Sequence, residues 1–207
     1  MYVPSAFAMT DRAELFAFMR QHSFALLVST VQNEPWATHL PLLLDPEDGP
    51  WGSLRGHVAR ANPHARFLHQ QPVLVVFSGP HAYISPTWYA AEGTVPTWNY
   101  VAVHAYGRCE CLDEPESTKQ LLGEMVQEYE AGLSSPWRFD PHGRDADRLV
   151  AAVVGFRIVI ERLEGKWKLN QNHPPERQAR VIAELEKSDD PSVRQIADMM
   201  QRTGSAR

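Results

Sequence analysis

Residues 97–112 read TWNYVAVHAYGRCECL, and the prediction of the fold rests on this stretch. Its even positions from Tyr100 to Tyr106 carry one set of side chains, and Val101, Val103 and Ala105 stand between them. Successive side chains of a β-strand point to opposite faces of a sheet, so the alternation predicts one long strand over residues 97–112. The other predicted elements extend outward from this strand.

The segments that precede the long strand predict further strands. Val73–Phe77 is an unbroken apolar run typical of a buried strand, and Ala82–Ser85 follows as a short strand after a Gly79-Pro80 turn. Earlier, Phe24–Val31 and Trp36–Leu44 flank the turn signal Gln32-Asn33-Glu34 and predict a β-hairpin. Trp51–Val58 predicts one more short strand.

The segments that follow the long strand predict a helix and a second hairpin. Asp113–Ala131 has apolar residues at helical spacing, with Asp113 as a candidate cap. Asp145–Val153 predicts a short helix. Gly155–Leu163 and Lys166–Leu169 predict a hairpin that turns at Glu164-Gly165.

Helices are expected at three further places. Thr10 precedes the amphipathic stretch Asp11–Gln21, and Asn62-Pro63 is a typical helix start for a helix reaching Gln70. Two helices, Pro174–Lys187 and Pro191–Arg202, are expected to form a C-terminal helical hairpin. Strands in runs with helices at intervals favour an antiparallel α+β architecture, built as a barrel, over a doubly wound parallel sheet.

Composition and charge exclude several classes of protein. The chain has 207 residues, a formal net charge of −5 and a sequence pI near 6.0, which argues against a broad nucleic-acid-binding face. The apolar runs are too short to cross a membrane as a helix, and the N-terminus lacks a signal-peptide pattern, so a cytoplasmic location is expected. Cys109 and Cys111 alone do not make a disulfide framework.

Residues 56–64 form the first group suited to ligand binding, at the point where a strand leads into a helix start. Free backbone N–H groups at such a junction favour an anion, and Arg60 adds a planar donor fork suited to phosphate. The alternative is that Asn62 only caps the helix and that Arg60 is a solvated surface residue.

Two other groups combine aromatic, amide and cationic side chains. Residues 83–89 and 95–100 interleave large rings with hydroxyl and amide groups, a pattern suited to a flat heteroaromatic ligand such as a flavin or porphyrin. The alternative for these rings is core packing or a dimer interface. Lys168 and Gln171, near the end of the last predicted strand, suit ring carbonyls or phosphate oxygens, or else lie on an exposed hairpin face.

Familiar catalytic and metal-binding motifs are absent from the sequence. There is no Gly-x-Ser-x-Gly, Gly-x-Gly-x-x-Gly, P-loop or His-Glu-x-x-His pattern, and Cys109-x-Cys111 has no second cysteine pair. We therefore expect no metal site and assign no catalytic acid, base or nucleophile.

Taken together, these segments resemble the PaiB-type family of FMN-binding split-barrel proteins, which are described as negative transcriptional regulators. The resemblance runs over about residues 1–185, and Asn170 stands where the family usually has serine. It is carried by MYVP at 1–4, THLP at 38–41, GHVARANP at 56–63, GPHAYISPTWY at 79–89, VPTWNY at 95–100, VH at 103–104 with Gly107, PW at 136–137 and GKWKLNQN at 165–172.

The resemblance implies an antiparallel FMN-binding split β-barrel with peripheral helices over residues 1–172 and a C-terminal helical extension over 173–207. It further implies a homodimer with two FMN sites at the subunit interface, each built from both chains. Arg60 would anchor the phosphate with His57 and Asn62, Thr38 would lie beside the isoalloxazine, and Lys168 would reach the partner's flavin. The full set of implied cofactor-binding residues is Thr38, His39, Leu40, His57, Arg60, Asn62, Trp98, Asn99, Lys168, Gln171 and Asn172.

Three functional hypotheses follow. The first is an FMN-binding protein, with flavin-dependent oxidoreductase activity on an unknown substrate as an extension. The second is a transcriptional regulator that contacts DNA through its C-terminal helices, although these helices serve equally well to cap the barrel. The third is haem binding or degradation, with His57, His104 or His173 as iron ligand.

Overall fold

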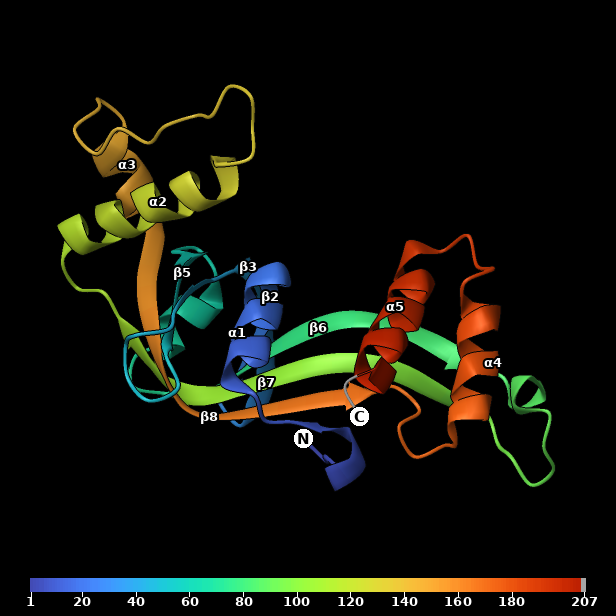
Figure 1. The fold of residues 1–207 in the computed structure, drawn as a ribbon. Coiled ribbons are helices and arrows are strands. Elements are labelled where there is room, and N and C mark those ends of the chain that lie inside the picture. Colours follow the sequence, from blue (N-terminus) through green and yellow to red (C-terminus); the bar gives the residue numbers. More distant parts are fainter. Residues whose placement is uncertain (206–207) are drawn as a thin grey trace. The chain divides into compact units, whose positions relative to one another are not determined.

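The computed structural model describes residues 1–205 and contains a single antiparallel sheet with helices around it (Figure 1). The strands are β1 (Ala8–Met9), β2 (Phe24–Val31), β3 (Glu34–Pro41), β4 (Leu43–Asp45), β5 (Ser53–Ala59), β6 (Pro72–Ile84), β7 (Thr97–Cys111) and β8 (Val153–Lys168). The α-helices are α1 (Arg12–Gln21), α2 (Pro115–Glu130), α3 (Ala146–Ala151), α4 (Pro175–Leu185) and α5 (Pro191–Ser205), and the 3₁₀ turns are η1 (Ser5–Phe7), η2 (Pro63–Phe67) and η3 (Pro86–Tyr89).

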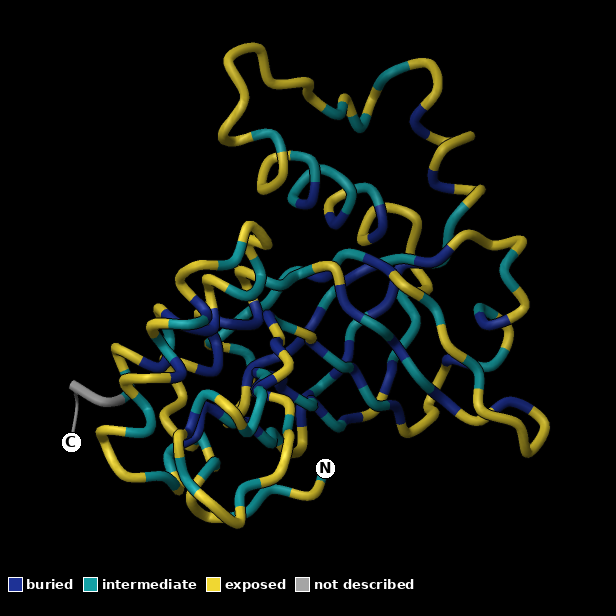
Figure 2. The backbone as a smooth tube through the Cα atoms, turned by 90° about the vertical axis from the view of Figure 1, so that its right-hand side faces the viewer, coloured by how far each residue is buried: buried dark blue, intermediate teal, exposed yellow. Residues whose placement is uncertain are grey.

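The strand order is β3-β2-β6-β7-β8-β5-β4, and β1 pairs with β8 outside this path. The sheet does not close on itself, as in a split barrel, and the α+β fold class predicted from the sequence is confirmed. The long strand predicted over residues 97–112 is β7, and its odd positions from Asn99 to Cys109 are buried. Dark-blue buried stretches run along the strands of the sheet in Figure 2.

The chain divides into two compact units. The terminal unit comprises Met1–Phe18, Ser78–Val103 and the chain from Glu164 onward. The central unit comprises Met19–Phe77 and His104–Leu163. Since each unit draws on separate stretches of sequence, β6, β7 and β8 each contribute residues to both. The division at residue 172 that the family resemblance implies stays a prediction.

The hairpin of β2 and β3 in the central unit has the tightest possible connection. Val31 pairs with Glu34, and the two residues between them, Gln32 and Asn33, have φ of 52° and 67°. Two consecutive positive φ values are the mark of the two-residue turns that match the twist of paired strands. The turn fixes the register, so that Leu27 lies opposite Thr38 and Ser29 opposite Trp36.

Two turns predicted at glycines are wrong, because the chain continues straight through both. Gly79 lies inside β6 and Gly165 inside β8. A Cβ added at Gly79 would stand 2.7 Å from the Phe18 ring, and one at Gly165 would stand 2.4 Å from Leu15. Both glycines therefore allow Leu15 and Phe18 of α1 to lie close against the sheet, and neither bends the chain.

The helix predicted from Asn62 to Gln70 is only the 3₁₀ turn η2. The start of this element is confirmed, since the Asn62 side chain accepts a hydrogen bond from the His64 N–H. Leu68 is fully buried and β6 begins at Pro72, which leaves room for a single turn before the chain becomes extended. The cap predicted at Asp113 is also displaced, because α2 begins after Glu114.

In the terminal unit, α4 and α5 form the expected helical hairpin and lie side by side in Figure 1. The hairpin buries Val181, Leu185, Ile196, Ala197 and Met200. It is tied to the rest of this unit by hydrogen bonds, from the Arg180 guanidinium to the Tyr89 carbonyl oxygen at 2.9 Å and from the His81 N–H to the Ser192 hydroxyl at 3.3 Å. The inner face of the hairpin is therefore used in packing.

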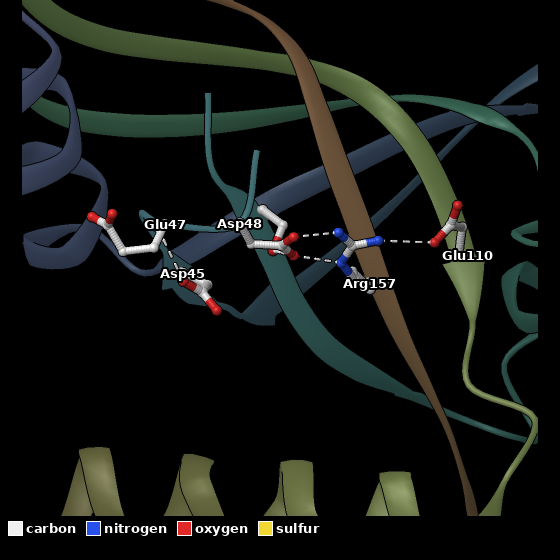
Figure 3. Close-up of polar contacts among 6 residues, drawn as sticks. Asp45, Glu47, Asp48, Glu110 and Arg157 are labelled. Carbon is white, nitrogen blue, oxygen red and sulfur yellow. Dashed lines mark hydrogen bonds and ion pairs between the residues drawn. The ribbon is translucent and has the colours of Figure 1, made fainter. Parts of the chain in front are cut away.

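One ionic cluster holds the turn after β4 in the central unit. Arg157 on β8 donates to both carboxylate oxygens of Asp48, at 2.6 and 2.5 Å, and to Glu110 on β7 at 3.1 Å (Figure 3). Hydrogen bonds from Arg157 and Ser53 lower the pKa of Asp48 to about 2. The turn of residues 45–50 is thus anchored by charge to the middle of the sheet.

Candidate functional site

The residues expected to bind a cofactor fall into two groups, one in each unit. Thr38, His39, Leu40, His57, Arg60 and Asn62 belong to the central unit, and Trp98, Asn99, Lys168, Gln171 and Asn172 belong to the terminal unit.

The central group is organised by a buried histidine that joins two of its members. The Asn62 amide donates to the Thr38 hydroxyl at 3.2 Å, and Thr38 Oγ1 lies 2.9 Å from Nδ1 of His64. On its other side, His64 Nε2 lies 2.8 Å from the Ser29 hydroxyl. His64 is fully buried, and burial lowers its pKa. A neutral polar network therefore fixes the turn after β5 against β2 and β3.

Arg60 lies at the end of β5 and holds the end of a helix. Its Nε and Nη2 donate to the carbonyl oxygens of Ala151 and Val153, both at 2.7 Å, and its backbone N–H donates to Ala152 at 2.8 Å. A cation is stabilised at a helix C-terminus, where carbonyl groups are left without partners, and these bonds fix the plane of the guanidinium. The side chain is exposed, so its remaining N–H donors can reach a ligand.

The other members of the central group differ in exposure. His39 is exposed on β3 and stacks on the Phe24 ring, with ring centroids 6.2 Å apart. Leu40 is buried, so its backbone is the part open to a ligand. His57 is half-buried on β5, its Nδ1 is buried without a hydrogen-bond partner, and burial lowers its pKa. A buried ring nitrogen without a partner is a group that a ligand or a water molecule can complete.

Three hollows of the central unit lie near this group or beside α2, and one of them, of about 520 Å³, lies between α2 and residues 136–139. Arg60 lines a cavity of about 270 Å³ together with Thr118 and the carboxylates of Asp113 and Asp147. A cleft of about 550 Å³ lies between α2 and β4 and contains the ion pair of Arg55 and Glu124, at 2.5 Å. None of the other predicted cofactor-binding residues lines any of these hollows.

In the terminal group, Trp98 and Lys168 lie together. The Lys168 ammonium donates to the Trp98 carbonyl oxygen at 2.8 Å and to the Thr97 hydroxyl. Trp98 is 52% exposed, and its ring lies 5.9 Å from those of His81 and Tyr83. Burial, followed by the charge of Lys166, lowers the pKa of Lys168. The result is an exposed aromatic surface with a cation beside it.

The remaining members of this group lie in other surroundings. Asn99 is fully buried, and its amide donates to the sulfur of Met200 on α5 at 3.5 Å, so its side chain points into the unit. The Gln171 amide bonds to the backbone of preceding residues, accepting from Leu169 N–H at 2.7 Å and donating to the Trp167 carbonyl oxygen at 2.5 Å. Asn172 is exposed. The structure thus groups Trp98 with Lys168 but does not place Asn99 on the same surface.

Two important residues were not among the predicted ones. The sequence places His64 at the end of the group 56–64 but assigns it no role, although the hairpin register puts the Ser29 and Thr38 hydroxyls on one face of the sheet. Lys166 is 7% exposed, donates to the Tyr2 carbonyl oxygen at 3.1 Å and lies 5.0 Å from the Tyr100 ring centroid. No local sequence pattern predicts that Lys166 is buried.

The histidines considered as haem ligands are separately placed. His57 and His104 belong to the central unit, and in each the Nδ1 atom is buried without a partner. His173, in the terminal unit, stacks on the Tyr89 ring at 4.6 Å. Among residues 1–205, no cluster of three or more histidine, cysteine or carboxylate side chains is arranged to hold a metal ion.

An open antiparallel sheet with this strand order, flanked by helices, defines an α+β protein of the split-barrel class. The family model “Putative FMN-binding domain” matches residues 1–162. The protease synthase and sporulation protein PAI 2 of Bacillus subtilis is 37% identical over 203 residues, covering 97% of each chain. The chain therefore belongs to the family of this FMN-binding domain, which confirms the resemblance found in the sequence.

Solved structures agree on the fold. The “FAD and Heme binding protein” from Mycobacterium smegmatis superposes with a TM-score of 0.61 at 14% identity, over 83% of this chain and 78% of that one. The flavocytochrome Anf3 from Azotobacter vinelandii gives 0.61 at 15% identity, over 84% and 75%. These two matches, each at or below 15% identity, support the fold alone.

No helix within residues 1–205 is long and apolar enough to span a membrane.

Proposed function

We propose that the chain binds FMN, with the phosphate held by Arg60 and Asn62 and the ring system beside Thr38. The observation that carries this proposal is the donor set at the end of β5. Two guanidinium donors of Arg60 are used on carbonyl oxygens, which leaves the others of its five N–H groups for a phosphate. The Asn62 amide likewise uses one N–H on Thr38 and keeps a second.

The fit to a phosphorylated flavin depends on charge as well as on donors. Arg60 is fixed in orientation by its carbonyl partners, so little side-chain entropy is lost when a phosphate binds. We place the phosphate outside the cavity that Arg60 shares with Asp113 and Asp147, because two acidic residues line this cavity, although Lys119 pairs with Asp147 at 2.9 Å. A bound flavin supplies redox chemistry on its own ring, while the residues of the chain bind and orient it.

The phosphate anchor is tested by comparing FMN with riboflavin, which lacks the phosphate. Charge-assisted hydrogen bonds are worth about 1.5–3 kcal/mol, so Arg60→Ala is expected to weaken FMN binding by about tenfold or more in a fluorescence titration. Riboflavin affinity should stay unchanged. Arg66→Ala removes a neighbouring exposed arginine of the same charge and serves as the control. Equal affinity of the unaltered protein for FMN and riboflavin, or no flavin binding, would overturn the proposal.

We further propose a homodimer in which the central group of one chain and the terminal group of its partner complete each FMN site. Two observations support a second copy. β3 ends the strand order, so among the described residues one of its edges has no neighbouring strand. Phe24, which stacks with His39 of β3, is 68% exposed. Unpaired strand edges and exposed rings are features that proteins usually cover.

Mixed dimers test this arrangement. Arg60→Ala damages the central group and Lys168→Met the terminal group, so each variant alone is expected to bind FMN weakly. A dimer with one chain of each kind, isolated by two affinity tags, should regain about half of the FMN capacity, since one of its two symmetric sites is intact. The reciprocal dimer, with both substitutions on one chain, should regain none. The opposite pattern, or a monomer, would contradict the proposed dimer.

DNA binding finds no comparable support. The inner face of the α4–α5 hairpin is buried within the terminal unit. Its outer face carries both signs of charge, with Arg177, Arg180 and Lys187 interspersed with Glu184 and Glu186. A surface that neutralises phosphates requires clustered cations. Regulation through direct DNA contact therefore stays a prediction of the family resemblance.

A further inference from the structure

The His64 ring lies between two hydroxyl groups, so both of its nitrogens are engaged. Nε2 lies 2.8 Å from the Ser29 oxygen and Nδ1 lies 2.9 Å from the Thr38 oxygen. Burial lowers the pKa of His64, so the ring is neutral near pH 7. A neutral imidazole has one N–H donor and one acceptor nitrogen. Only two arrangements of its proton are therefore possible.

Ser29 decides between the two arrangements. Ser29 is only 5% exposed. Among the described residues, its hydroxyl has His64 as its hydrogen-bond partner. If Nε2 carried the proton, Ser29 would accept it and its own O–H would be buried without an acceptor, at the full desolvation cost of that group. If Nδ1 carries the proton, the Ser29 O–H donates to Nε2 and no buried group is left unpaired. The second arrangement is the stable one.

The Nδ1–H arrangement determines what Thr38 can offer to a ligand. Thr38 Oγ1 then accepts two hydrogen bonds, from His64 Nδ1 and from the Asn62 amide at 3.2 Å. A hydroxyl oxygen has two lone pairs, so both are used and only the O–H proton remains. Thr38 is half-buried, and its proton can point to its open side.

We infer that His64 is a positioning residue that turns Thr38 into an outward-facing hydrogen-bond donor for an acceptor atom of the flavin. This inference rests on the proposed function for the identity of the ligand. Carbonyl oxygens, ring nitrogens and phosphate oxygens of FMN all accept hydrogen bonds, so a donor is the useful group for Thr38 to present. The opposite tautomer would leave Thr38 without a proton to donate.

The tautomer is measured in the protein without flavin by ¹⁵N NMR of its nine histidines, with His64 assigned by the signal lost in His64→Gln. We expect a one-bond N–H correlation at Nδ1 of His64 and an unprotonated Nε2. The Ser29→Ala variant should release this preference, because the hydroxyl that enforces it is gone. A proton at Nε2 in the unaltered protein would overturn the inference.

The consequence for the ligand is measured by FMN titration of Thr38 variants. Thr38→Val keeps the shape of the side chain but removes the donor, and it should weaken FMN binding by about threefold to tenfold. Thr38→Ser retains the hydroxyl and should bind within about twofold of the unaltered protein. If the unaltered protein binds FMN and the valine and serine variants bind it with equal affinity, the inference is contradicted.

Substitutions of His64 separate positioning from general packing. His64→Asn presents an amide N–H about where Nδ1–H stands and should keep more FMN affinity than His64→Leu, which fills the space without a donor. Equal loss in both variants, with folding intact by circular dichroism, would contradict a positioning role. Failure of the unaltered protein to bind any flavin would instead overturn the proposed function, and the NMR experiment would still decide the tautomer.

Discussion

Two turns of the central unit are pinned to the sheet by opposite chemistry. The turn of residues 45–50 is held by an ionic cluster of Arg157, Asp48 and Glu110, whose side chains are about a third exposed. The turn of residues 59–64 is held by the neutral network of Asn62, Thr38, His64 and Ser29, whose central ring is fully buried. Both anchor a loop, but only the second holds a half-buried hydroxyl with a proton to spare.

The two networks differ in the number of hydrogen-bond donors that they leave for a ligand. In the ionic cluster, the best donors and acceptors face one another, so the cluster stabilises the loop and offers little to a ligand. In the neutral network, each group satisfies its neighbour, and unused donors remain on Asn62 and Arg60 of the turn and on Thr38 of β3, to which Asn62 is hydrogen-bonded. Substitutions in the two networks should therefore differ in their effects on stability.

His64→Ala is expected to have the largest effect on stability. The substitution leaves a buried hole and removes the partner of Ser29, so the free energy of unfolding should fall by about 2–4 kcal/mol in urea denaturation. His142→Ala, at an exposed position, should change it by less than about 0.5 kcal/mol. Similar values for the two variants would show that the neutral network is not a main anchor of its turn.

Arg157→Met should cost less, although it breaks more ion pairs. The Arg157 and Asp48 side chains are 30% and 32% exposed, so water can solvate the carboxylates that remain, and a loss of about 1 kcal/mol is expected. Arg148→Met, which removes an exposed pair with Asp145, should cost about 0.3 kcal/mol. A loss at Arg157 as large as that of His64→Ala would invert the comparison.

The pH dependence of the two anchors should fall in different ranges. Burial lowers the pKa of folded His64 below 6.5, so the unfolded chain takes up a proton first as the pH falls. The stability that neutral His64 contributes is complete at pH values well above 6.5 and declines as the pH falls below 6.5. The stability difference between the unaltered protein and His64→Gln should therefore be constant at pH 7–8 and shrink toward pH 5. A constant difference down to pH 5 would mean that folding leaves the pKa of His64 unchanged, and a difference that grows toward pH 5 would mean that folding raises it.

The Asp48 contribution should be the smallest and should disappear in a more acidic range. Hydrogen bonds from Arg157 and Ser53 lower its pKa from 3.8 to about 2, so its contribution is present above about pH 4 and is lost as the pH falls from 4 through 2. The stabilities of the unaltered protein and of Asp48→Asn should converge below pH 2. Added salt should narrow their difference at pH 6, which distinguishes an ionic anchor from a neutral one.

Local patterns predicted the strands well but not the places where the chain passes straight through a glycine. The alternation of residues 97–112 and the turn at Gln32-Asn33 carry their own signals. Gly79 and Gly165 are predicted as turns because glycine is a common turn residue. Each is instead glycine because a side chain there would collide with α1, at Phe18 and at Leu15 respectively, and α1 is far away in the sequence. No neighbour in sequence reveals that contact.

The candidate site shows the same limit. The Asn62 cap and the exposed Trp98 follow from residue type and local spacing. The burial of Asn99 against Met200 depends on where a helix a hundred residues later is placed. The hydrogen bond from the Gln171 amide to the Trp167 carbonyl oxygen depends on the turn after β8. Residue chemistry therefore predicts which groups can bind, and only the fold tells which of them are free to do so.

The most direct test of this account is a crystal structure of the protein with FMN. We expect the phosphate oxygens within about 2.7–3.2 Å of Arg60 and Asn62, and an acceptor atom of FMN at a similar distance from Thr38 Oγ1. FMN bound in the cleft beside Arg55 and Glu124, or bound with Arg60 and Thr38 both out of contact, would contradict the account.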